Sequence, residues 1–236
     1  MAQKSGPTVE VDALEVDALP AVAQDYLKAI FRLAEWDHEP VTAARIAGEL
    51  GLKPSTTTEG LKRLESQGLI SREAYKPVEL TTAGRAAAMA MVRRHRMIET
   101  FLVETLGYGW DEIHDEAERI EHAVSETFVE RLAAHLGNPQ RDPHGDPIPD
   151  PTGHITAASV RSLADLAEGE DSVVERISDK DPGLLRYLEA NGIVPGAVII
   201  ALERPYPSML TVGVGGSQVP VSAESACLVR VRHVHG

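Results

Sequence analysis

Apolar residues recur at helical spacing in the first third of the chain. The helix predicted over residues 20–35 carries such a stripe, made of Val22, Tyr26, Leu27, Ile30 and Leu33. Thr42 is typical of an N-cap, and we expect a short helix from there to Gly51. A third helix is expected to begin at Pro54 or Ser55 and to end at Gly68.

The next segment changes from helical to strand-like spacing. Residues 69–80 suit two short strands around a turn at residues 75–77. Two helices joined by a glycine turn and followed by a hairpin are typical of a winged helix-turn-helix. A long helix is predicted from Thr82 to about Leu106, and a further helix from Glu112 to Leu136.

Residues 137–159 are rich in proline and glycine and are predicted to be a linker. Short β-type runs follow at residues 172–177, 198–203, 209–214 and 227–231, with one helix over residues 182–190. Short strands at this spacing favour a small SH3-like β-barrel. The predicted fold class is therefore mainly α with small β.

Composition narrows the cellular setting. The chain has 236 residues and a single cysteine, Cys227, which excludes an internal disulfide and fits a reducing compartment. Residues 1–19 are acidic, without the basic and apolar regions of a secretory signal, and are expected to form a flexible tail. No segment is apolar enough to span a membrane. We therefore expect a cytoplasmic protein without a membrane partner.

The charge is unevenly distributed. The formal net charge is -13, which on its own argues against a nucleic-acid partner. Basic residues nevertheless gather within residues 20–96, whereas acidic residues concentrate in residues 111–130 and 165–181. The N-terminal third can therefore face phosphate while the acidic remainder stays away from it.

In a helix-turn-helix, the start of the second helix enters the major groove. The candidate DNA-reading residues there are Lys53, Ser55, Thr56, Thr57 and Thr58. The candidate phosphate contacts are Lys62, Arg63, Arg72 and Lys76. The alternative is that the hydroxyl residues only cap a helix and that the winged unit binds protein.

Histidines and carboxylates share helix faces further along. His95 and Glu99 are four residues apart, and the next predicted helix carries His114, Glu118, Glu121 and His122 on one stripe. Imidazole and carboxylate groups suit Mn, Fe, Co, Ni or Zn ions. A solvated helix face with His/Glu pairs is the alternative interpretation.

Catalysis is the rival use of such residues. The segment His114-Asp-Glu-Ala-Glu118 lacks the second histidine of the metalloprotease helix, and no glycine-rich phosphate loop is present. Cys227 falls in a predicted strand and is expected in the core. We therefore expect no enzyme and no small organic substrate.

The order of several motifs resembles the diphtheria-toxin-repressor family of metal-dependent regulators, in particular its manganese-sensing branch. The motifs are Ala23-Gln-Asp-Tyr-Leu-Lys28, Leu80-Thr-Thr-Ala-Gly84, Arg93-Arg-His-Arg-Met-Ile-Glu99, His114-Asp-Glu-Ala-Glu118 with Glu121-His122, and Pro143-His-Gly-Asp-Pro-Ile-Pro149. The resemblance covers nearly everything after Ala21. It implies a winged helix-turn-helix over residues 20–88, a helical dimerisation and metal-binding domain over residues 89–152, and an SH3-like (FeoA-type) domain over residues 153–236. It also implies a homodimer that binds double-stranded operator DNA.

The resemblance also implies two metal sites. The ancillary site would comprise His95, Glu99, His114 and, from the C-terminal domain, Asp179, and the primary site would comprise Asp25, Glu118, Glu121 and His122. Asp181, which precedes Pro182, is expected to be an N-cap instead of a ligand.

Two sequence positions indicate which metal ion the chain binds. Iron-sensing members have methionine at the position of Asp25 and cysteine at that of Glu118. Carboxylates suit Mn²⁺ better than soft sulfur ligands do. Mn²⁺ is therefore the expected activator of a transcriptional repressor of metal-homeostasis genes. Fe²⁺ stays open as a second activator, and other divalent transition metals can substitute in vitro.

Two other readings stay open. The chain could be an iron-responsive member of the same family, or a winged-helix regulator that needs no metal. A metal-dependent hydrolase is a distant third.

Overall fold

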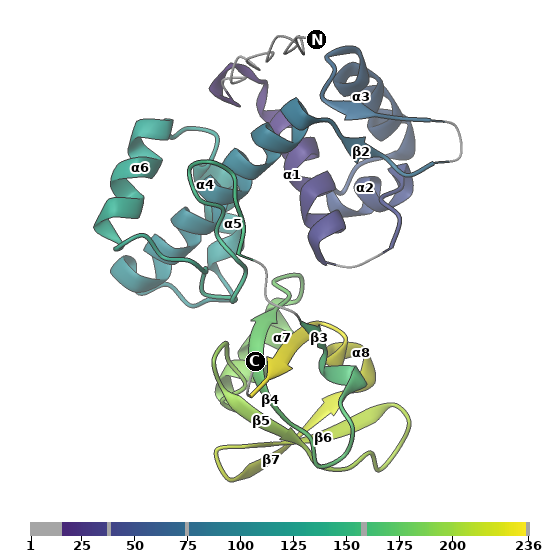
Figure 1. Ribbon diagram of the computed structural model, residues 1–236, viewed down its shortest axis with the longest axis vertical. Helices are drawn as coiled ribbons and strands as arrows, with labels where there is room; N and C mark the ends of the chain where they lie inside the picture. Colours follow the sequence, from purple (N-terminus) through teal and green to yellow (C-terminus); the bar gives the residue numbers. More distant parts are fainter. Residues whose placement is uncertain (1–15, 37–38, 74–75, 157–159, 235–236) are drawn as a thin grey trace, which may run out of the picture. The chain divides into compact units, whose positions relative to one another are not determined.

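The computed structural model describes residues 16–36, 39–73, 76–156 and 160–234 of the chain (Figure 1). The chain forms two compact units, residues 1–92 and residues 93–236. Among the described residues, no helix has the length and apolar character needed to cross a membrane.

The first unit is a winged helix-turn-helix, as the sequence predicts. After the 3-10 turn Val16–Ala18, it contains α1 (Ala21–Trp36), α2 (Ala43–Glu49) and α3 (Pro54–Ser66). Strands β1 (Ile70–Ser71) and β2 (Glu79–Leu80) pair antiparallel. The Thr42 hydroxyl caps α2 by accepting from Arg45 N at 3.3 Å, which confirms the predicted cap.

The core of this unit follows the predicted apolar stripes with one exception. Leu27, Ile30, Ile46 and Leu61 are almost fully buried, because α2 and α3 pack against α1. Val22, which the periodicity places on the same stripe of α1, is 63% exposed.

Helix α4 (Thr82–Leu106) is one uninterrupted helix with the bounds expected from the sequence. Its first turn packs closely on the start of β1, since a Cβ at Gly84 would overlap the carbonyl of Leu69. Every residue from Met91 to Thr100 is buried, so this stretch of α4 carries interior side chains on all faces.

The single helix predicted over residues 112–136 was wrong. The structure has α5 (Ile113–Ile120) and α6 (Glu126–His135), separated by a turn. Ser125 adopts an extended conformation, and its hydroxyl accepts from Phe128 N at 3.3 Å. Local capping by serine therefore starts a new helix where periodicity alone continues the old one.

The linker predicted over residues 137–159 was also wrong for residues 144–149. Residues 144–149 are buried. The guanidinium of Arg96 donates to Pro147 O at 2.6 Å, and that of Arg93 donates to Pro149 O at 2.8 Å. Two arginines of α4 thus hold the backbone of this segment, which we call the α4-facing loop (residues 140–149).

The C-terminal part is a six-stranded antiparallel sheet of the SH3-like kind, with the strand order β3-β8-β4-β5-β6-β7. The strands are β3 (Arg161–Ser162), β4 (Asp171–Ile177), β5 (Val198–Ala201), β6 (Met209–Val214), β7 (Ser217–Ser222) and β8 (Val229–His233). The 3-10 turn Leu163–Asp165 and the helices α7 (Pro182–Ala190) and α8 (Ala223–Ala226) complete it.

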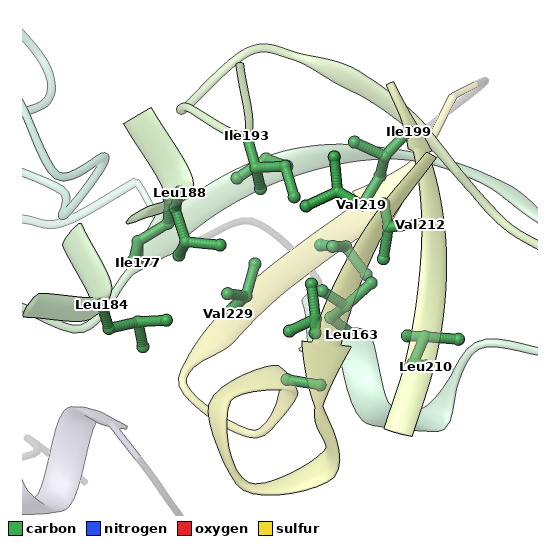
Figure 2. Packing of buried hydrophobic residues seen from close by; sticks show 14 of the residues in the cluster. Leu163, Ile177, Leu184, Leu188, Ile193, Ile199, Leu210, Val212, Val219 and Val229 are labelled. Atoms are coloured by element: carbon green, nitrogen blue, oxygen red, sulfur yellow. The ribbon is translucent and has the colours of Figure 1, made fainter. Parts of the chain in front are cut away.

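Side chains of the sheet and of α7 enclose an apolar core (Figure 2). Leu188 from α7 and Ile199, Val212 and Val229 from three strands meet there. Asp181 caps α7 by accepting from Gly183 N and Leu184 N at 2.9 and 3.1 Å, as expected.

The sequence missed β3, β7 and α8. It also placed Cys227 in a buried strand, whereas Cys227 follows α8 as its C-cap and is exposed. That expectation was wrong because α8 runs to Ala226 and Cys227 caps its C-terminus, so that β8 begins only at Val229.

Candidate metal centre

The centre is built first on one face of α4. His95 and Glu99 stand one helical turn apart, with side chains that are 4% and 2% exposed. His95 Nε2 lies 3.0 Å from Glu99 Oε1. Buried ionisable side chains of this kind need hydrogen-bond, charge or metal partners. The side chains of His95 and Glu99 point toward each other.

Helix α5 and the segment after β4 add the other members. His114 Nδ1 lies 3.2 Å from His95 Nε2 and 3.1 Å from Asp179 Oδ2. One ligand atom from each of His95, Glu99, His114 and Asp179 falls within 4.8 Å of the others. We call these four residues the α4 cluster; they are the four residues that the resemblance assigns to the ancillary site.

The hydrogen bonding of His95 explains why this cluster suits a cation. His95 Nδ1 lies 2.6 Å from Glu121 Oε2, so Nδ1 carries the proton and donates it to that carboxylate. Nε2, the other ring nitrogen, faces a carboxylate oxygen and a second imidazole. Acceptors that converge in this way repel one another unless protons or a metal ion lie between them.

Glu99 has the properties of a metal ligand. Its Oε1 is buried and lies 3.0 Å from His95 Nε2 and 3.5 Å from His114 Nδ1. Burial alone would raise the pKa of Glu99, but the charge of His95 and the adjacent His114 hold that pKa well below its ordinary value. The carboxylate therefore stays ionised, and its Oε1 faces the two imidazoles of the cluster. Two imidazoles and two carboxylates, without sulfur, fit a borderline or hard divalent ion.

A second group lies at the end of α5. Glu121 is fully buried, and its Oε1 is 3.6 Å from His122 Nε2. Glu118 Oε1 is 3.9 Å from His95 Nδ1 and 3.7 Å from His114 Nε2. Glu121 caps α5, and His122 lies in the following turn. One ligand atom of Glu121 lies within 4.8 Å of one of His122, and one lies within 4.8 Å of one of Glu118.

Asp25, the fourth residue assigned to this second group, lies half-buried in α1. It belongs to the first unit, whereas Glu118, Glu121 and His122 belong to the second. Its participation stays a prediction.

Two residues near Glu99 were not among the predicted ligands. Asp142 and His144 of the α4-facing loop each bring one ligand atom within 4.8 Å of Glu99. His144 falls in the quoted motif from Pro143 to Pro149 and Asp142 directly precedes it, but no helical spacing links either residue to Glu99. His144 Nε2 donates to Trp110 O at 2.7 Å, which leaves Nδ1 as an acceptor in the neutral ring.

The ionisation of this pair reflects burial and close charges. Burial would lower the pKa of His144, but the negative charges of Glu99, Asp142 and Asp179 raise it above its ordinary value. Burial, together with the charges of Asp146 and Glu99, raises the pKa of Asp142 to about 8.

The residues predicted to contact DNA fall on α3 and on the hairpin. Those that are exposed are Lys53, Ser55, Thr56, Thr58, Lys62, Arg63 and Lys76, whereas Arg72 is half-buried. Thr57 is the exception, since it is fully buried and its hydroxyl donates to Lys53 O at 3.2 Å. A DNA contact by Thr57 was therefore a wrong prediction, because the helical turn directs this side chain into the core.

Comparisons with known protein families cover nearly the whole chain. The profile of the "Iron dependent repressor, N-terminal DNA binding domain" matches residues 18–78. That of the "Iron dependent repressor, metal binding and dimerisation domain" matches residues 81–150. That of the "FeoA domain" matches residues 161–233.

Individual proteins agree with these profiles. The iron-dependent repressor IdeR of Mycobacterium leprae (strain TN) is 34% identical over 222 residues, which cover 89% of this chain and 96% of that protein. A solved manganese-dependent transcriptional repressor in complex with manganese is 43% identical, with a TM-score of 0.86, and covers 90% of this chain and 100% of its own. The structure of ScaR with bound Zn²⁺ is 33% identical, with a TM-score of 0.76, over 90% of this chain and 99% of its own.

Proposed function

Since this chain belongs to the diphtheria-toxin-repressor family of metal-dependent regulators, which are not enzymes, we propose that it is a transcriptional repressor activated by Mn²⁺. Metal dependence and DNA binding belong to the family as a whole. The choice of manganese is the proposal.

The observation that carries this choice is the ligand chemistry around Glu118, Glu121 and His122. Among the residues that the structure describes, the ligand atoms that converge there are carboxylate oxygens and imidazole nitrogens, and positions 25 and 118 hold carboxylates. Carboxylate oxygen suits Mn²⁺, whereas thiolate and thioether favour softer ions. A solved relative described as a complex with manganese supports the same choice.

The switch would work by joining two domains. Asp25 would supply a carboxylate from α1. The dimerisation domain would supply the carboxylates of Glu118 and Glu121 and the imidazole of His122. The metal ion provides the positive charge that holds these groups together. The reading helices of a dimer must match the spacing of two operator half-sites, so fixing their orientation raises DNA affinity.

Thermodynamic linkage sets a condition on this switch. The metal must bind the DNA-competent arrangement more tightly than the other arrangement, and DNA must then tighten metal binding in return. The α4 cluster would hold a second ion, bound by His95, Glu99, His114 and Asp179. That ion would join α4 and α5 to the C-terminal domain.

We further propose a cytoplasmic homodimer whose α3 helices read operator DNA. The exposed hydroxyls of Ser55 and Thr56 can bond to bases or phosphates, and Lys62 can neutralise a phosphate. Phe128, on α6, is 44% exposed. We propose that it lies in the dimer interface.

The test is a titration of labelled DNA fragments with the metal-free protein and then with Mn²⁺, Fe²⁺ or Zn²⁺ under anaerobic, reducing conditions. We expect sequence-selective binding that appears with Mn²⁺ and is lost in Glu118→Ala. Glu116→Ala is the matched control, because Glu116 lies on the same helix and pairs with Arg119 at 2.8 Å instead of facing the cluster.

Two results would change the conclusion. Selective binding with Fe²⁺ but not with Mn²⁺ would make the chain an iron-responsive member, an alternative that its relatives named iron-dependent favour. Equal selective binding without metal would leave a winged-helix regulator without a metal switch.

A further inference from the structure

A chain of buried charges links α4 to the C-terminal sheet. Arg96, next to His95 on α4, has a side chain that is 4% exposed, and its Nη2 lies 3.6 Å from Asp146 Oδ2. The other oxygen of Asp146 lies 3.1 Å from Nε of Arg176, on β4. None of Arg96, Asp146 and Arg176 is a metal ligand in the sites proposed above.

The backbone around Asp146 is held at the same place. Ile177 N donates to His144 O at 2.9 Å, which joins the α4-facing loop to the last residue of β4. A Cβ at Gly145 would overlap the carbonyl of Glu175 and lie 2.9 Å from Arg176 Cα. The loop and the strand therefore touch backbone to backbone, without room for a side chain between them.

An irregularity in β4 allows two neighbouring residues to reach this loop. The register of β4 against β8 shifts between Val174 and Arg176. Successive strand residues normally point to opposite faces, but a bulge redirects them. Accordingly, Glu175 pairs with Arg141 of the loop, and Arg176 pairs with Asp146 of the same loop.

The metal ligand Asp179 follows directly. It stands two residues after the end of β4, so its backbone lies within about 7 Å of Ile177. Ser178 N donates to Leu228 O at 2.9 Å, which also fixes the direction in which the chain leaves the strand. The place of the Asp179 carboxylate beside His114 thus depends on where β4 ends relative to α4.

We propose that Arg176 is a positioning residue for the α4 cluster: through Asp146 and Arg96 it holds the end of β4 against α4 and so places Asp179 beside His114. This inference rests on the proposed function, since it concerns the second metal of that function. It assigns to the C-terminal domain a role in metal affinity that depends on a residue that does not itself bind the metal.

The decisive experiment is a double-mutant cycle on the full chain, read out by calorimetric titration of the metal-free protein with Mn²⁺. Groups that orient a ligand typically change metal affinity by 10- to 100-fold. We expect Arg176→Gln to weaken one of the Mn²⁺ binding events by about 10-fold. In an Asp179→Asn background the same substitution should cause no further loss, because the ligand it positions is already impaired.

Two further variants separate positioning from general damage. Arg232→Gln is the matched control. Arg232, on β8, donates to Glu175, the neighbour of Arg176 on β4, at 2.8 Å and does not reach Asp146. It should leave both binding events unchanged. Arg176→Lys should restore part of the lost affinity, since it keeps the charge without the full reach of the guanidinium. If Arg176→Gln does not fold, Asp146→Asn takes its place in the cycle.

Failure of the positioning role and failure of the proposed function would give different results. Unchanged Mn²⁺ binding by Arg176→Gln, or an equal loss in both backgrounds, would overturn the positioning role while leaving the manganese switch intact. A wild-type chain that does not bind Mn²⁺ would overturn the proposed function and this inference together.

Discussion

Gly145 offers the sharpest test of how the α4-facing loop is packed. Its φ is +87°, and an added Cβ would overlap the carbonyl oxygen of Glu175. Because the obstacle is backbone, no side-chain movement relieves it. The substitution Gly145→Ala must therefore either strain the turn or push the loop away from β4.

The cost can be worked from the contacts that would be lost. An L-residue in the left-handed region costs about 1 kcal/mol. Separation would break the bond from Ile177 N to His144 O, worth about 1 kcal/mol. It would also separate Asp146 from Arg176, and breaking a buried ion pair costs about 3 kcal/mol. The sum, about 5 kcal/mol, is comparable with the whole stability of a small domain.

The assay is urea unfolding of the metal-free protein, followed by fluorescence in a Trp36→Phe background. Trp110, the other of the two tryptophans, is buried and stacked on His144 at 5.8 Å between ring centroids, so its emission reports on this loop.

The control is Gly169→Ala, where φ is +79° but no atom lies within 4 Å of an added Cβ. It should cost only about 1 kcal/mol. If Gly145→Ala and Gly169→Ala destabilised the protein equally, the close contact between loop and strand would be refuted.

Three further predictions follow from single residues. The pKa of Asp142 is raised to about 8, above its value of about 3.9 in an unfolded chain, so this group contributes stability below pH 4 that is lost as the pH rises through 8. Asp142→Asn should therefore flatten the fall in metal-free stability between these values, and an unchanged urea midpoint profile would contradict the raised pKa. Asp181→Ala should lower stability by about 1 kcal/mol through loss of the α7 cap, while calorimetry finds the same number of bound Mn²⁺ ions as in the wild type. Asp179→Ala should lose one bound Mn²⁺ ion and leave the stability of the metal-free protein unchanged. Loss of a Mn²⁺ ion in Asp181→Ala would instead make Asp181 the ligand and Asp179 the cap. Lys62→Gln should reduce the slope of log affinity against log salt for operator DNA by about 0.9, as one phosphate contact is lost, and an unchanged slope would remove Lys62 from the interface.

Much of the fold was open to prediction because local signals decide it. Thr42 caps α2, Asp181 caps α7, and α4 has the bounds that the sequence predicts. The hairpin strands β1 and β2 lie within residues 69–80, as expected. Such features depend on neighbours in sequence, so a single sequence contains them.

Other elements required the surrounding structure. Periodicity continued one helix through residues 121–125, where the Ser125 cap in fact starts a new one. The strands β3 and β7 are short or partly exposed, and their place is set by pairing with β8 and β6. Val22 was expected to be buried and is exposed, whereas Thr57 was expected to be exposed and is buried. The packing of neighbouring helices decides which part of a helix surface is covered.

The residues of the candidate site divide in the same way. Helical spacing brings His95 to Glu99 and His114 to Glu118, and the resemblance to a known family adds Asp179. The sequence by itself thus determined most of the local elements, the donor chemistry and the family.

Only the tertiary structure decided that His95 bonds to Glu121, that Asp142 and His144 lie beside Glu99, and that Arg176 reaches Asp146. The physical reason is distance along the chain. These pairs are separated by 26 or more residues, so their meeting depends on how α5, the α4-facing loop and β4 pack on α4 and on one another, which no local pattern records.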